Sequence, residues 1–175
     1  MNKVLLSLGS NLSSRKLNIK SCIEFLNNAK KIDVIGVSSL YESSPMYNFE
    51  QDNFINCVIE IKTSLKPLEL IRKTRSIEVK MGRQVGLGAN QPRKIDIDIL
   101  TYNREIIIEK NLNIPHPGIK ERKFVLIPLF ELKGNISIPG HCEKIEDLIE
   151  DLDKNSDKIR KCNYSINEKN LSYSS

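Results

Sequence analysis

The sequence lacks several features that would identify common classes of protein. Its four cysteines are widely spaced and form no C-x-x-C pair, which argues against a zinc site or a thiol redox centre. No apolar run is long enough to span a bilayer, and the start of the chain soon turns polar, unlike a secretion signal. We therefore expect a cytoplasmic protein with reduced cysteines and no membrane partner.

The sequence also contains no common nucleotide-binding loop and no long block of like charge. It has neither G-x-x-x-x-G-K-[ST] nor G-x-G-x-x-G, so any nucleotide must be bound without these phosphate-binding loops. The net charge of +5 suits an anionic ligand, but it could equally reflect a generally basic, solvated surface. Because the basic residues are dispersed, we expect no nucleic-acid partner.

The pattern of apolar residues predicts a mixed α+β fold. The chain has 175 residues, 39% of them hydrophobic and 28% charged, which fits a globular domain with a real core. Strand and helix patterns alternate in the order β-α-β-β-α-β, which is typical of a ferredoxin-like split βαβ fold with helices on the faces of an antiparallel sheet. In that order the segments are 3–9, 13–30, 31–41, 53–63, a helix starting at Pro67, and 94–101.

A C-terminal extension follows these elements. "EIIIE" predicts an extra strand, while "FVLIPLFEL" and "KIEDLIEDL" predict helices, the first bent or broken by Pro128. Residues 42–52 and 82–92 are rich in turn-forming residues and predict loops, the second of them mobile. We expect a single domain over 1–153 and a polar tail over 154–175, whose composition favours disorder.

The most informative stretch is "KIDIDIL". Side chains alternate along a strand, so the isoleucines would share one face and Asp96 and Asp98 the other. Two carboxylates on one face repel each other, so a cation, a basic cluster or water must surround them. Mg²⁺ binds one or two protein carboxylates together with phosphate oxygens, which makes the pair a candidate metal site. A polar, exposed strand face is the alternative.

Basic residues lie close to this stretch in the sequence. Arg93 directly precedes it, and Arg83 opens the glycine-rich loop that leads to it. Arginines in such positions suit phosphate binding, although they could simply balance the acidic strand. His116 lies between two prolines that stiffen the backbone, and Arg122 follows it. These two residues could bind phosphate oxygens, or His116 could be structural.

Three further residues suit a flat heterocyclic ligand. In the third strand Phe54 and Asn56 would share the face opposite the core. An amide offers a donor and an acceptor to the edge of a heterocycle, and the rings of Phe54 and Phe124 could enclose its faces. Alternatively, the two phenylalanines belong to the core and Asn56 forms a turn.

Taken together, these segments resemble the 6-hydroxymethyl-7,8-dihydropterin pyrophosphokinase (HPPK) family of folate biosynthesis. The matching segments are "SLGSNL", "SSLYESSPM", "FINCVIEI", "PRKIDIDIL" and "IPHPGIKERKFVLIPLFEL", which cover most of residues 3–132. The resemblance implies a ferredoxin-like core. It also implies transfer of a pyrophosphoryl group from ATP to the hydroxymethyl group of the pterin, with release of AMP.

The resemblance also implies roles for individual residues. Asp96 and Asp98 would bind two Mg²⁺ ions, and Arg83 and Arg93 would be catalytic. The pterin would contact Ser43, Ser44, Met46, Phe54, Asn56 and Phe124, with Asn56 at its edge and the phenylalanines at its faces. ATP would contact Glu78 and Ile99 through its nucleoside, and His116 and Arg122 through its phosphates.

The chain departs from the family pattern in the loop before Arg93. Asn90 stands where the family often has tryptophan, and "NQPR" replaces a frequent W-G-P-R, so closure over the substrates should be looser. Two other functions stay open. One is a different D-x-D metal-dependent nucleotidyl or glycosyl transferase. The other is a non-catalytic ferredoxin-like module that binds RNA or a small molecule, although "FINCVIEI" lacks the glycine-aromatic pattern of RNA-binding sheets. We expect a monomer.

Overall fold

An antiparallel sheet forms the centre of the protein. The computed structural model describes residues 1–46, 50–84, 91–153, 159–164 and 166. The sheet follows the order β5-β1-β4-β3-β8, while β2 and β3 pair with opposite ends of β4. Its strands are β1 (Asn2–Ser10), β2 (Ile32–Val37), β3 (Tyr41–Ser43), β4 (Phe54–Thr63), β5 (Asp96–Tyr102) and β8 (Ile159–Lys161).

The connections confirm the predicted ferredoxin-like α+β fold. Helix α1 (Arg15–Asn27) joins β1 to β2, and β4 lies between these two strands. Helix α2 (Pro67–Lys80) joins β4 to β5, and β1 lies between those two. This double insertion is the split βαβ arrangement.

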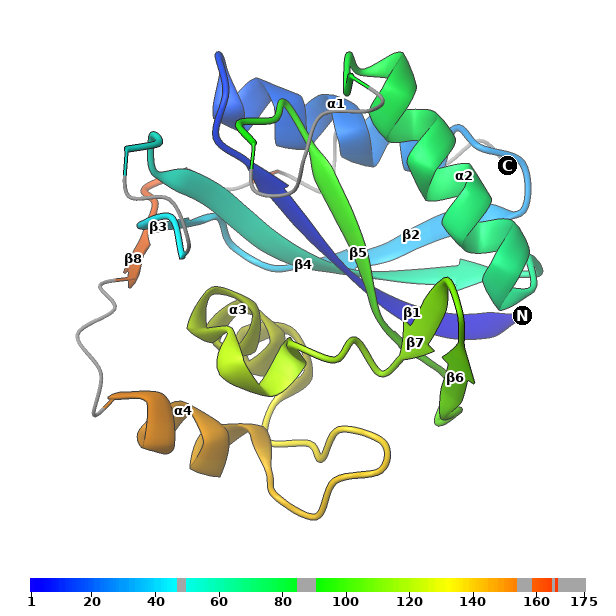
Figure 1. Cartoon of the computed structure of the whole chain (residues 1–175), viewed down its shortest axis with the longest axis vertical. Helices are drawn as coiled ribbons and strands as arrows, with labels where there is room; N and C mark the ends of the chain where they lie inside the picture. Colours follow the sequence, from blue (N-terminus) through cyan, green and yellow to red (C-terminus); the bar gives the residue numbers. More distant parts are fainter. Residues whose placement is uncertain (47–49, 85–90, 154–158, 165, 167–175) are drawn as a thin grey trace.

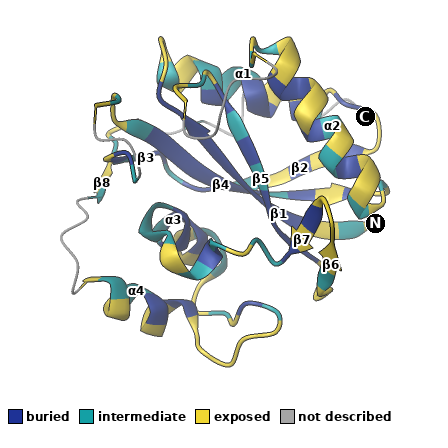
Figure 2. Ribbon diagram, in the orientation of Figure 1, coloured by how far each residue is buried: buried dark blue, intermediate teal, exposed yellow. Residues whose placement is uncertain are grey.

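Helices cover both faces of the sheet (Figure 1). On one face α1 and α2 pack against alternate strand residues, among them Cys57, Ile59, Ile97 and Ile99. On the other face α3 (Lys123–Lys133) and α4 (Ile145–Asp153) pack against the intervening residues, such as Val58 and Leu100. Figure 2 shows the consequence, because the strands are largely buried while the helices expose their outer surfaces.

Three predictions about the elements are wrong. The predicted strand 31–41 is two strands, because the hydroxyl of Ser38, rather than a backbone oxygen, accepts from the backbone nitrogen of Val58 (3.0 Å), which ends the backbone pairing of β2 with β4. The predicted loop 42–52 begins with the end of β3. The prediction that the tail is disordered is wrong for Ile159–Lys161, which form the strand β8. A run of three residues, two of them charged, is too short to be recognised as a strand from the sequence.

Helix α3 also continues through Pro128, which does not break it. Burial of that proline offsets the backbone hydrogen bond it cannot donate. The extra strand predicted at "EIIIE" is confirmed as β6 (Ile107–Glu109), which pairs with β7 (Leu112–Ile114) in a separate hairpin. A 3-10 turn at Ile119–Glu121 precedes α3.

Two expectations stay open after this comparison. Most of the predicted mobile loop 82–92 lies outside the described residues. The division into a domain over 1–153 and a tail over 154–175 stays a proposal, although β8 joins part of the tail to the sheet. Among the described residues, no helix is both long and apolar enough to cross a membrane.

We predict that Thr63→Val lowers the free energy of unfolding by about 1–3 kcal/mol. The Thr63 hydroxyl is fully buried, donates to the backbone oxygen of Lys31 (2.6 Å) and accepts from the backbone nitrogen of Leu65 (3.1 Å). Valine keeps the shape but leaves both backbone groups without this partner. Urea denaturation measures the loss, with Lys62→Ala on the exposed neighbouring position as a control. Equal unfolding free energies for Thr63→Val and the wild type would contradict this role.

Candidate active site

The centre of the site is a row of residues that crosses three neighbouring strands. Asp96 of β5 lies opposite Gly9 of β1, and Gly9 lies opposite Asn56 of β4. In the next row on the same face, Asp98 lies opposite Ser7. A Cβ atom at Gly9 would lie 3.1 Å from Oδ1 of Asn56, so glycine leaves room for that amide. The alternation of β5 thus places both carboxylates on the same face as Asn56.

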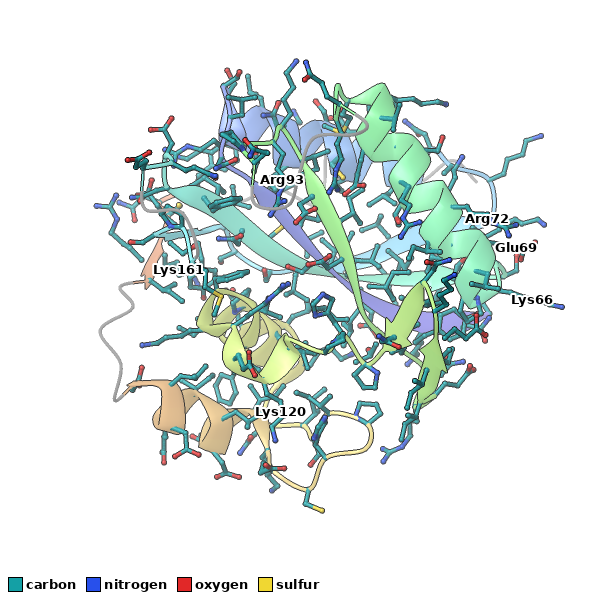
Figure 3. The ribbon with its side chains drawn as sticks, viewed as in Figure 1. Lys66, Glu69, Arg72, Arg93, Lys120 and Lys161 are labelled. Carbon is teal, nitrogen blue, oxygen red and sulfur yellow. The ribbon has the colours of Figure 1, made fainter. Side chains whose placement is uncertain are left out.

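Each carboxylate has its own cationic partners. Asp96 accepts from Arg83 (3.0 Å) and forms an ion pair with Arg93 (3.2 Å), which Figure 3 places at the end of the sheet where β5 begins. Asp98 pairs with Arg122 (2.8 Å), and Nε2 of His116 lies 3.7 Å from the same carboxylate. Burial and the charge of Asp98 raise the pKa of Asp96, and the arginines only partly reverse this rise.

Glu78 lies beneath this cluster on α2 and fixes the helix to β5. Its Oε1 accepts from the backbone nitrogen of Ile97 (2.9 Å) and from Arg83 (2.5 Å). Burial raises the pKa of Glu78 to about 7, although both hydrogen bonds lower it. Glu78 therefore holds Arg83 between two acidic side chains at the edge of the site.

His116 has a defined proton position. Its Nδ1 accepts from the backbone nitrogen of Gly118 (3.0 Å), so in the neutral ring Nε2 carries the hydrogen. Burial lowers the pKa of His116, although the charge of Asp98 raises it. The ring therefore presents an N–H donor toward Asp98 and the space around it.

A cleft on the exposed part of this sheet face brings together the residues predicted to bind the pterin. All six of them line it: Ser43, Ser44, Met46, Phe54, Asn56 and Phe124. Nδ2 of Asn56 donates to the hydroxyl of Ser43 (2.9 Å), which fixes the orientation of the amide. Each aromatic ring has an arginine over it, Arg93 at 5.8 Å from Phe54 and Arg122 at 5.9 Å from Phe124.

A second, more polar cavity lies on the other side of the two aspartates. Of the residues predicted to bind ATP, Glu78, Ile99 and His116 line it, whereas Arg122 lines the first cleft. Arg83 also lines the second cavity, and Arg93 lines the first. Asp96 and Asp98 line both. The two cavities therefore meet at the carboxylate pair.

Sequence reasoning missed several residues that shape the site. Asn11 is buried, accepts from the backbone nitrogen of Arg93 (2.8 Å) and donates to the side chain of Gln51 (2.8 Å). It thereby connects the segment before β5 to the chain that lines the first cleft. Gly9 was detectable, because a glycine inside an apolar strand often marks a close approach. Asn11 and Gln51 had no such signal, since their partners are distant in sequence.

Asp96 and Asp98 are also the residues that could hold a metal ion. No group of three or more His, Cys, Asp or Glu side chains suited to a metal occurs within the described part of the chain. Mg²⁺ does not require such a group, because it completes its coordination with water and substrate phosphates. A pair of carboxylates between two cavities fits that type of site.

Known proteins of related sequence share most of this chain. The sequence model described as 7,8-dihydro-6-hydroxymethylpterin-pyrophosphokinase (HPPK) matches residues 5–134. The 2-amino-4-hydroxy-6-hydroxymethyldihydropteridine pyrophosphokinase of Bacillus subtilis is 41% identical over 133 residues, which cover 75% of this chain and 78% of that protein. The protein of the same name from Aquifex aeolicus is also 41% identical, over 79% of this chain and 85% of that protein.

Other relatives are much longer than this chain. The folic acid synthesis protein fol1 of Pneumocystis carinii is 43% identical over 82% of this chain, which spans only 20% of that protein. The crystal structure of Plasmodium falciparum HPPK-DHPS A437G/K540E with pterin and p-hydroxybenzoate has a TM-score of 0.68 at 19% identity, and the match covers 86% of this chain and 43% of that chain. This likeness confirms the fold, and the sequence matches establish that the chain belongs to the HPPK family.

Proposed function

We propose that this protein transfers a pyrophosphoryl group from ATP to the hydroxymethyl group of 6-hydroxymethyl-7,8-dihydropterin. The products are the pterin diphosphate and AMP, and the reaction belongs to folate biosynthesis. The observation that carries this proposal is the meeting of two cavities at Asp96 and Asp98. Membership of the HPPK family favours this activity over another D-x-D transferase or a non-catalytic binding module.

The first cleft suits the pterin. Asn56 is held by Ser43 and offers an amide edge, which matches the donors and acceptors along the edge of a pterin ring. Phe54 and Phe124 supply the aromatic surfaces that favour a flat ring system. In this orientation the hydroxymethyl group would extend toward the two aspartates, which also line the cleft.

The second cavity suits ATP. Ile99 and the neighbouring side chains can contact the nucleoside, while His116 can donate from Nε2 to a phosphate oxygen. Arg122, on the other side of the aspartates, can contact the phosphates at the junction. The triphosphate would then lie across Asp96 and Asp98, with its β-phosphorus facing the pterin.

The transfer itself is a displacement at the β-phosphorus of ATP. A bond forms between the hydroxymethyl oxygen and that phosphorus, the hydroxyl proton passes to water, and the bond to the oxygen bridging the α- and β-phosphates breaks, so AMP leaves with the bridging oxygen. Two Mg²⁺ ions held by Asp96 and Asp98 would supply charge neutralisation for the triphosphate. Arg83 and Arg93 lie beside Asp96 and would contact the transferred group, so the protein would contribute position and positive charge.

We also propose that the protein is a monomer in the cytoplasm and that it has no nucleic-acid or membrane partner. The direct test of the function is AMP formation from ATP and Mg²⁺ with and without 6-hydroxymethyl-7,8-dihydropterin. AMP that appears only with the pterin supports the proposal. ATP consumption independent of the pterin, or no turnover at all, would reject it.

We predict that Asp96→Ala and Asp98→Ala each abolish most AMP formation without unfolding the protein. Either change removes a proposed Mg²⁺ ligand and also removes the repulsion between two close carboxylates, which contributes to the raised pKa of Asp96. The measurement is turnover at saturating Mg²⁺, together with thermal unfolding. Asp33→Ala, on an exposed position of β2, is the matched control. Near-normal turnover in either site variant would show that two metal ligands are not required.

We predict that Asn56→Ala weakens pterin binding by about 1–3 kcal/mol and leaves the binding of an ATP analogue nearly unchanged. The substitution removes a donor and an acceptor, so polar groups along the pterin edge lose their partners. Calorimetry with each ligand separately measures both affinities. Equal losses for the two ligands would mean that Asn56 supports the fold of the site as a whole, through its hydrogen bond to Ser43.

We predict that Arg83→Ala and Arg93→Ala lower kcat more than they lower the affinity for either ligand. Both guanidinium groups are paired with Asp96 without ligand, and contacts to the transferred group form mainly in the transition state. Single-turnover kinetics and equilibrium binding separate the two effects. The control is Arg72→Ala, since Figure 3 shows Arg72 on α2, well away from Arg93. Affinity that falls in step with rate would identify the arginines as ordinary binding residues.

A further inference from the structure

The C-terminal strand β8 lies directly against the wall of the first cleft. Its residues pair with β3 in the register Ile159 opposite Ser43, Arg160 opposite Glu42 and Lys161 opposite Tyr41. The backbone nitrogen of Cys162 donates to the oxygen of Leu40 (2.8 Å), which continues the pairing beyond the strand. This segment lies beyond residue 134, where the match to the family ends. The wall of the cleft therefore depends on a segment outside the matched region.

Side chains add contacts around β8 on both faces of the sheet. Arg160 pairs with Glu42 (2.8 Å), which also accepts from Arg15 of α1 (3.0 Å). Lys161, which Figure 3 labels at β8, pairs with Glu131 of α3 (2.8 Å). Both cations are more than half exposed, at 82% and 57%, and exposed ion pairs contribute little. The backbone pairing and the apolar residue of the strand must therefore supply most of its attachment.

That apolar residue is Ile159, and it is half-buried behind the cleft. A small cavity is lined by Ile159 together with Ser43, Ser44, Met46 and Phe124. The same four residues line the first cleft from its other side. Ile159 therefore lies behind the wall that carries the hydroxyl partner of Asn56 and one of the two aromatic rings.

We propose that Ile159 is a positioning residue for the pterin pocket, and that β8 holds Ser43–Met46 in the conformation that binds the pterin. This inference rests on the proposed function and concerns the same site. The backbone of Ile159 pairs with Ser43 of the wall, and Ile159 does not line the ATP cavity, so the loss of its side chain should affect one substrate only. Truncating the side chain widens the small cavity and lets the wall shift away from Asn56 and Phe124.

The test compares Ile159→Ala, Ile159→Val and the wild type in the full chain. Calorimetry measures the Kd of the pterin and of an ATP analogue, and steady-state kinetics measure kcat and both KM values. We expect the Kd of the pterin to rise about fivefold in Ile159→Ala and less in Ile159→Val, with the Kd of the ATP analogue and kcat within about twofold. The control is Arg160→Ala, on the same strand and the opposite face, which should leave both affinities unchanged.

The outcomes separate this inference from the function on which it rests. If the wild type binds no pterin, the proposed function fails and the positioning role fails with it. If the wild type binds pterin and both Ile159 variants bind it with the same Kd as the wild type, only the positioning role fails. A lower melting temperature with equal losses for both ligands, or lower kcat at unchanged KM values, would also overturn it, because a purely structural residue would give those results. Should Ile159→Ala not fold, the difference between Ile159→Val and the wild type decides.

Discussion

The arrangement of the site depends on two carboxylates, Asp96 and Asp98, which lie close together on one face of β5 while the other face of that strand is buried. Asp96 and Asp98 project from β5 on the side away from α1 and α2, and each is held by separate cationic groups. The pKa of Asp96 remains raised in spite of its two arginines, so desolvation and repulsion outweigh their attraction. The free protein therefore keeps a local electrostatic cost at the centre of its site, which a ligand carrying cations could relieve. Stability of the fold must come from elsewhere, chiefly from the apolar face of the same strand.

The packing of that apolar face fixes the positions of the polar side chains in the site. Ile97 and Ile99 are packed against the helices, so β5 cannot rotate or slip by one residue without exposing them. The register then fixes Asp96 opposite Gly9 and Asn56, and Asp98 opposite Ser7. Glu78 adds a further restraint by joining α2 to the backbone of β5 and to Arg83. The positions of the polar groups are thus a consequence of hydrophobic packing on the opposite side of the sheet.

Much of this arrangement was predictable from the sequence, and the remainder was not for identifiable reasons. The alternation of side chains along a strand correctly predicts that Asp96, Asp98, Phe54 and Asn56 lie on the face opposite the isoleucines. The face on which a strand residue lies depends only on its neighbours in the chain. Ion-pair partners such as Arg122 depend on a turn and a helix start more than twenty residues away, and alternation carries no information about them. The break after β2 and the strand β8 were missed because bulges and short edge strands are decided by tertiary pairing. Asn11 was missed for the same reason, since its partners Arg93 and Gln51 come from other parts of the chain.

Under the proposed function the arginines would have two roles, one in the free protein and one in the complex with substrates. In the free protein Arg83, Arg93 and Arg122 pair with the two carboxylates, which lie on the same face of β5 and repel each other. Under the proposed function Mg²⁺ would take over the carboxylates, and the guanidinium groups would then be released next to the phosphates that the metal ions bring with them. The same positive charges would serve first to keep the free site intact and then to stabilise the transferred group in the transition state. Such an exchange needs no long-range movement by Arg93 and Arg122, because both already line the cleft in which the acceptor would lie.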